Sequence, residues 1–145
     1  MNLLKVLFIV VFGCATFQWI HADEALKVTK AWVRMMPPSE RTTAAYLVIE
    51  NNTDQPMVLQ SASSDAVEIV EMHQMSRKDG MMKMGMARDI VVPAKGIFSF
   101  DEAGYHLMLI NLKESLKKNA IIPIVLHFKD GQNIAFDAVV KEGQE

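Results

Sequence analysis

Residues 121–140 read IIPIVLHFKDGQNIAFDAVV, and this stretch decides the fold class. Two apolar runs, residues 121–128 and 133–140, flank the dipeptide Asp130-Gly131. An Asp-Gly pair between two such runs is a strong short-range signal for a β-hairpin. The stretch therefore predicts a pair of antiparallel strands.

The rest of the chain repeats this pattern of short apolar runs separated by turn residues. No long segment shows the 3.6-residue period of an amphipathic helix, and no internal repeat is visible. Residues 112–120 could form either a helical turn or a long loop. The pattern predicts an all-β fold of seven to nine antiparallel strands, a sandwich or Greek-key β-barrel. The further strands are expected among residues 26–33 (with a bulge), 43–50, 57–62, 67–75, 82–86, 90–92, 97–100 and 105–110.

The length and the first residues indicate one exported domain. The chain has 145 residues and a formal net charge of −2, which suits a single globular domain and gives no indication of a nucleic-acid partner. Residues 1–22 resemble a secretory signal peptide, with Lys5 before a mostly apolar run and Ala22 before the cut. We therefore expect residues 23–145 to form one exported β-barrel domain in the periplasm, with no stable membrane insertion after the signal is removed.

Cys14 is the only cysteine of the chain. It lies in the segment that we expect to be removed, which leaves a mature domain without a thiol. Such a domain forms no disulfide and cannot supply the thiolate of a blue-copper centre. A minor alternative is a lipoprotein anchored at Cys14, although Phe12 fits that signal poorly and the apolar run continues past the cysteine.

Methionine and histidine side chains gather in the middle of the chain. Six of the 11 methionines lie between residues 72 and 86, close to His73, and a second pair, His106 and Met108, follows. Side chains two apart on a strand share a face, so His106 and Met108 can converge on one ion. Imidazole and thioether groups without a thiolate are a ligand set for a soft metal ion, and copper(I) is the leading candidate.

All of these ligands are neutral when they bind the ion. Its charge is therefore not cancelled locally, and binding should be weaker than in a thiolate site, which suits transfer better than storage. Only the histidines must lose a proton, so we expect the affinity to fall as the pH drops below about 6.5.

Three segments resemble the PCu(A)C family of periplasmic copper chaperones. They are Glu71-Met72-His73, Gly80-Met81-Met82-Lys83-Met84 and Gly104-Tyr105-His106-Leu107-Met108. The similarity extends from Val28 to Val140. It implies a cupredoxin-like β-barrel and delivery of copper toward the binuclear copper centre of cytochrome c oxidase. Carried over to this chain, the motif makes four residues the copper(I) ligands: His73, Met84, His106 and Met108.

The chain departs from the family pattern at two places. Gly85-Met86 follow the central methionine, where members of the family often have Arg-Pro, and this difference could either loosen the loop or add a spare thioether. The tail, residues 141–145, contains neither histidine nor methionine, whereas some members bind copper(II) through such a tail. A copper(II) site is therefore not indicated.

The remaining methionines and histidines have simpler interpretations. Met72 faces away from His73 by strand alternation and should belong to the core, whereas Met57 suits core or surface packing. Met75 and Met86 share strand faces with the proposed ligands and are auxiliary candidates. Met35 and Met36 suit core or surface packing, His127 has no methionine two residues away and is interpreted as structural, and His21 should leave with the signal.

The function expected is a monomeric, non-enzymatic copper(I) carrier. The expected partner is a copper-accepting protein, either cytochrome c oxidase subunit II or another copper chaperone. Two alternatives remain open. The chain could buffer copper for tolerance in the periplasm, or it could be a metal-independent β-sandwich that binds a protein through its methionine-rich surface.

Overall fold

The structure, a computed structural model, describes residues 24–143. The predicted signal peptide, with Cys14 and His21, lies outside the described residues. Residues 24–143 contain no helix of the length and hydrophobicity that a membrane crossing requires. The elements are ten strands: β1 (Leu26–Arg34), β2 (Thr42–Asn51), β3 (Met57–Ser63), β4 (Val67–Lys78), β5 (Met81–Met86), β6 (Ile90–Val92), β7 (Gly96–Phe100), β8 (Tyr105–Leu112), β9 (Ile121–Phe128) and β10 (Asn133–Lys141).

The predicted hairpin at residues 121–140 is confirmed. β9 and β10 pair antiparallel, with Asn133 opposite His127, and Gly131 in the turn has a φ of 93°. Glycine reaches this positive φ without steric cost, which is why Asp-Gly is favoured in such turns. The bulge expected in the first strand is also present, between Thr29 and Trp32.

The strands form one sheet in the order β5-β4-β8-β2-β1-β10-β9-β3-β6, and β7 pairs separately with β2. Only β1 and β10 run parallel among the pairings of residues 24–143. The all-β, cupredoxin-like fold is confirmed. There are ten strands rather than seven to nine, because every candidate segment forms a strand of its own, including the short β6, which pairs with β3, and β7, which pairs with β2. Residues 113–120 form a loop and not a helical turn.

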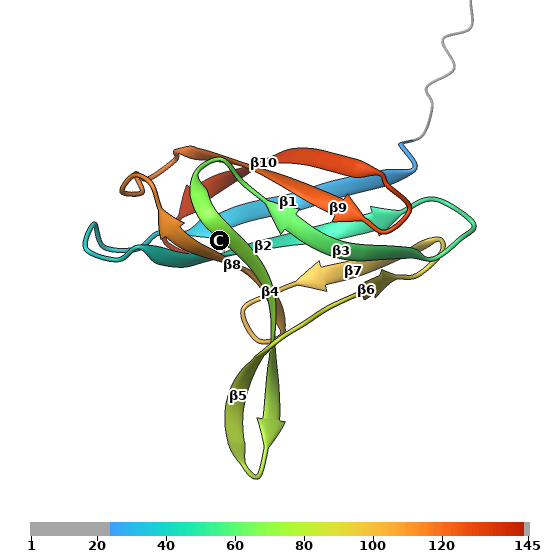
Figure 1. Cartoon of the computed structure of the whole chain (residues 1–145), viewed down its shortest axis with the longest axis horizontal. Coiled ribbons are helices and arrows are strands. Elements are labelled where there is room, and N and C mark those ends of the chain that lie inside the picture. Colours follow the sequence, from blue (N-terminus) through green and yellow to red (C-terminus); the bar gives the residue numbers. More distant parts are fainter. Residues whose placement is uncertain (1–23, 144–145) are drawn as a thin grey trace, which may run out of the picture.

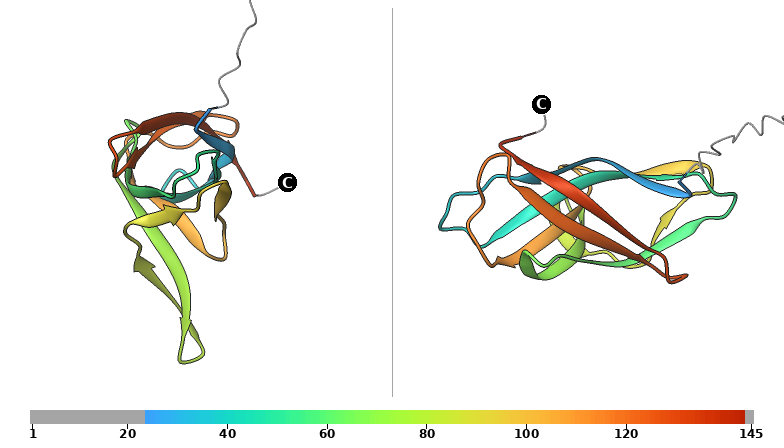
Figure 2. Two further views of the ribbon diagram at one scale, coloured as in Figure 1. Left: turned by 90° about the vertical axis from the view of Figure 1, so that its right-hand side faces the viewer. Right: turned by 90° about the horizontal axis from the view of Figure 1, so that it is seen from above.

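The sheet curls on itself to enclose an apolar core, as the end-on view in Figure 2 shows. Strands of the body bury alternate side chains, so one face is apolar and the other is exposed. Burial of this apolar face is the main favourable term in folding. Side chains at most 1% exposed in the core include Val33, Leu47, Ile49, Leu59, Val92, Leu107, Leu109, Ile124, Leu126 and Val140.

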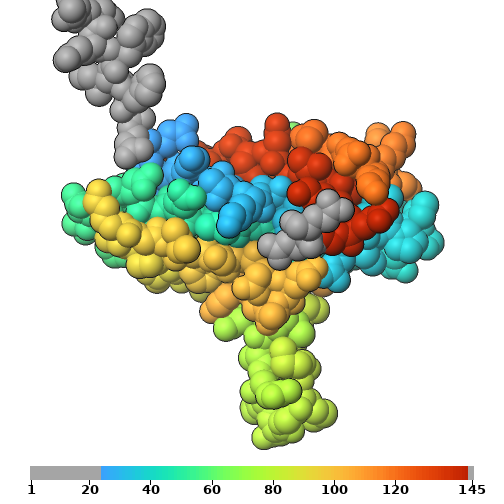
Figure 3. All heavy atoms as spheres, turned by 180° about the vertical axis from the view of Figure 1, so that it is seen from behind, coloured from blue at the N-terminus to red at the C-terminus, as the bar shows by residue number. Residues whose placement is uncertain are grey.

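A long hairpin projects from this body (Figures 1 and 3). The first half of β4 pairs with β8, and its second half continues outward and pairs with β5. Asp79 and Gly80 join β4 to β5 with φ angles of 53° and 76°, as a two-residue turn with two positive φ angles requires. All six residues of β5 are exposed. The hairpin is therefore held by its own ladder and by the base of β4, and not by the core.

Candidate metal site

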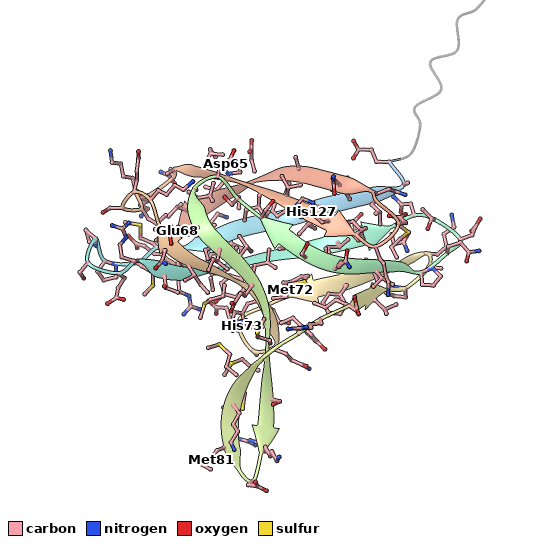
Figure 4. The ribbon with its side chains drawn as sticks, in the orientation of Figure 1. Asp65, Glu68, Met72, His73, Met81 and His127 are labelled. Carbon is pink, nitrogen blue, oxygen red and sulfur yellow. The ribbon has the colours of Figure 1, made fainter. Side chains whose placement is uncertain are left out.

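His73 and His106 are direct cross-strand partners on β4 and β8. Their ring centroids are 5.7 Å apart, with an angle of 60° between the ring planes. Figure 4 shows His73 at the base of the hairpin, where β4 leaves the body. Residues directly opposite each other in an antiparallel pair project to the same face of the sheet. Two imidazoles thus meet on one face, although a long stretch of sequence separates them.

The thioethers are placed on the same face by the same register. Met86 on β5 lies directly opposite His73, and Met84 lies opposite Met75, two residues closer to the hairpin tip. Met108 is two residues from His106 on β8, and it is opposite Glu71. The structure therefore brings His73, His106 and Met108 together, with Met86 as the nearest β5 methionine by register. Met84 is about 7 Å further along the strand at the backbone.

The ring of His73 is held by Glu71. Its Nε2 lies 2.7 Å from Glu71 Oε2, and these two side chains are two residues apart on one face of β4. Its Nδ1 is buried and has no hydrogen-bond partner within residues 24–143. When the ring is neutral and Nε2–H donates a hydrogen bond to the carboxylate, the free lone pair of the ring lies on Nδ1. A carboxylate that fixes the tautomer of a ligand histidine in this way is the usual outer partner of a metal-binding imidazole.

His106 is the most buried of the candidate ligands, with 6% of its surface exposed. Burial lowers the pKa of His106 from its ordinary value of 6.5, and the neighbouring His73 adds to the effect, against a hydrogen bond with the Gly104 backbone. A lowered pKa keeps the imidazole neutral, which is the form that binds a metal ion.

The donors on this face suit a soft ion better than a hard one. Within residues 24–143, no group of three or more His, Cys, Asp or Glu side chains is arranged to hold a metal ion. The face instead offers two imidazoles together with thioethers, a set that copper(I) accepts and that zinc, magnesium or calcium does not favour. Met84 and Met86 are 50% and 59% exposed, which leaves the ion accessible to another protein.

The other sequence interpretations agree with the structure where it describes them. Met72 is buried in the core, as predicted, and Met57, for which core or surface packing was expected, is also in the core. His127 Nε2 lies 2.7 Å from Ser63 Oγ, and its Nδ1 lies 2.8 Å from Asn133 Oδ1. Both ring nitrogens therefore form hydrogen bonds that link β9 to β3 and β10, which is a structural role. The sequence analysis missed the contact of Glu71 with His73. Its signal was the Glu-x-His spacing on one face of a predicted strand.

Comparison with solved structures identifies the class. The chain is similar to the solution structure of CuI-DR1885 from Deinococcus radiodurans, with 34% identity, 86% of this chain and 85% of that chain covered, and a TM-score of 0.67. It is also similar in fold to the copper-bound PCuAC domain from PmoF2, with 18% identity, 82% and 94% covered, and a TM-score of 0.68. The resemblance to the PCu(A)C family is thereby confirmed, and the fold and its histidine-thioether face define a PCuAC-type domain.

The particular family follows from the sequence comparison. The family described as "Putative lipoprotein LpqE-like" matches residues 26–140, and the chain belongs to this family. A relative, "Putative lipoprotein Lxx21020" of Leifsonia xyli subsp. xyli (strain CTCB07), is 28% identical over 120 residues, which are 82% of this chain and 71% of that protein.

Proposed function

We propose that this protein is an exported copper(I) chaperone that binds the ion without catalysing a reaction. The observation that carries the proposal is the direct pairing of His73 with His106, 5.7 Å apart and next to thioethers on one face. The copper-loaded PCuAC domains among the similar structures support the choice of metal. The names of the LpqE-like family and of its relative from Leifsonia support export from the cytoplasm.

Each proposed ligand has a distinct role. His73 and His106 supply the imidazoles, and Met108 supplies a thioether from the body of the domain. Met84 supplies a thioether from the projecting hairpin, and Met86 opposite His73 is the auxiliary candidate. Because β5 is not packed against the core, its thioethers can leave the ion while the body keeps the other ligands. That difference gives the site one fixed side and one movable side, as release to a partner requires.

The expected acceptor is a second copper-binding protein. We infer delivery toward the binuclear copper centre of cytochrome c oxidase, directly on subunit II or through another copper chaperone, from the family resemblance. The basic side chains of the hairpin, Arg77, Lys78 and Lys83, favour an acceptor with an acidic surface around its copper ligands.

Competition with a colorimetric copper(I) chelator tests the proposal. The protein should withdraw one tightly bound copper(I) per chain, and replacing His106 and Met108 together with alanine should abolish this while the circular dichroism spectrum stays unchanged. Copper K-edge absorption on the loaded protein should report copper(I) with both nitrogen and sulfur ligands. Retention of the tight ion by the double variant would refute the site. Failure of the unsubstituted protein to withdraw copper(I) from the chelator would favour the metal-independent sandwich that binds a partner through methionines.

A further inference from the structure

A row of thioethers continues along the hairpin beyond the histidine pair. Met75 on β4 and Met84 on β5 are directly opposite each other, so their side chains project to one face. Met82, two residues from Met84 on β5, projects to this same face, which is also the face of His73. The three methionines thus lie together near the outer half of the hairpin.

We propose that Met75, Met82 and Met84 form a second, weaker copper(I) site made of thioethers alone. This inference rests on the proposed function in one respect, because Met84 is a ligand in both sites. The outer site would take the ion from a donor or present it to an acceptor, and the inner site with His73 and His106 would hold it.

The geometry allows three sulfur atoms to meet. Opposed residues in an antiparallel pair have Cβ atoms about 4.5–5.5 Å apart, and diagonal neighbours are about 7–8 Å apart. Met75 and Met84 are such an opposed pair, and Met75 and Met82 are diagonal neighbours. A methionine side chain has three rotatable bonds, so its sulfur can cover these separations without a change in the backbone. Thioethers are soft donors that select copper(I) over harder cations.

Core packing does not account for Met82 and Met84, whereas Met75 is half-buried. Met82 and Met84 are 52% and 50% exposed, and every residue of β5 is exposed. Exposed methionines contribute little to stability, since the burial that stabilises a methionine is absent. A run of them on one hairpin face therefore needs a reason other than the fold.

The charge on this face explains why the outer site should be the weaker one. Arg77 lies directly opposite Met82, so a guanidinium projects to the same face next to the proposed ligands. A positive charge at this distance raises the free energy of a bound cation. The inner site has the carboxylate of Glu71 instead, in contact with His73. The ion is therefore drawn inward, from the cationic outer part of the hairpin to the histidines.

Movement between the two sites needs no redox step. The ion stays copper(I), Met84 remains bound, and neutral Met75 and Met82 are exchanged for neutral His73, His106 and Met108. No proton is released as long as both imidazoles are already neutral. A shared ligand lets the exchange proceed without free copper in solution.

The test is a titration of the whole protein with silver(I), a redox-stable mimic of copper(I), followed through the methyl resonances of the methionines. Two equivalents should bind, because Met86, which lies opposite His73, can replace Met84 in the inner site when Met84 serves the outer one. The second equivalent should shift the methyl signals of Met75 and Met82. Replacing Met82 with leucine should weaken the second ion about tenfold or more, a loss of about 1.4 kcal/mol, and leave the first unchanged. Met81→Leu is the matched control, because Met81 is 60% exposed on the same strand and projects to the opposite face. Figure 4 shows Met81 near the hairpin tip.

A charge variant provides an independent readout. Arg77→Gln should tighten the second ion about threefold, as expected for a unit charge removed at roughly 6 Å in a solvent-exposed position. The outer site is refuted if only one ion binds, or if Met82→Leu and Met81→Leu behave alike. Either result leaves the histidine site untouched. Conversely, if both ions bind with unchanged affinity in a His73→Ala, His106→Ala variant, the proposed function fails and the thioether site stands.

Discussion

The carboxylate of Glu71 offers the sharpest test of how the histidine site is organised. In the unsubstituted protein, Nε2 of His73 lies 2.7 Å from the charged Oε2 of Glu71. Glu71→Gln keeps the size and shape of the side chain, and its amide oxygen can still accept a hydrogen bond from Nε2. The substitution removes only the negative charge. We expect weaker copper(I) binding, because a neutral acceptor makes the imidazole less basic and holds its tautomer less firmly.

The magnitude follows from the exposure of the pair. Loss of an outer partner of a ligand histidine costs 10–100-fold in metal affinity as a rule, or about 1.4–2.7 kcal/mol. The side chains of His73 and Glu71 are 12% and 30% exposed, so solvent screens part of the interaction. The lower end, about tenfold, is therefore expected.

Competition against a colorimetric copper(I) chelator at fixed pH measures this change. Glu68→Gln is the control, because Glu68 also lies on β4 but is exposed and accepts a hydrogen bond from Asn111 at 2.9 Å. It removes the same charge without touching His73, and should change the affinity less than twofold. Equal effects of the two substitutions, or no effect of Glu71→Gln, would show that the carboxylate does not support the site.

Three further outcomes are expected. His73→Ala and His106→Ala should each weaken copper(I) binding at least a hundredfold, since each removes a whole imidazole ligand, and chelator competition checks this. In the copper-free protein, His106 should make the free energy of unfolding decrease as the pH falls below 6.5, and should have no effect on its pH dependence above that value. The reason is that the lowered pKa of His106 in the folded state lets the unfolded state bind more protons. Urea unfolding at a series of pH values measures this slope, which His106→Gln should reduce. Leu107→Ala should cost about 2–5 kcal/mol of unfolding free energy, whereas Met84→Ala on the exposed hairpin should cost under about 0.5 kcal/mol, and urea midpoints distinguish the two.

Local sequence signals were sufficient for most of the strands. The Asp-Gly turn at residues 130–131 and the alternation in residues 67–75 both predict what the structure shows, because turn chemistry and a period of two are properties of neighbouring residues. The pairing partners of the strands were less accessible, since nothing local in residues 90–92 and 96–100 shows that β6 pairs with β3 and β7 with β2. The parallel pairing of β1 with β10 joins the two ends of the domain and has no local signal.

The sequence by itself determined the kind of chemistry: it supplies imidazoles and thioethers, no thiol in the expected mature domain, and alternating strands on which residues two apart share a face. Tertiary structure alone decided that His73 lies opposite His106, that Glu71 holds the imidazole, and that Met86 rather than Met84 is closest by register. The physical reason is that pairing register depends on packing between strands distant in the chain. A shift of one residue would turn every one of these side chains to the opposite face.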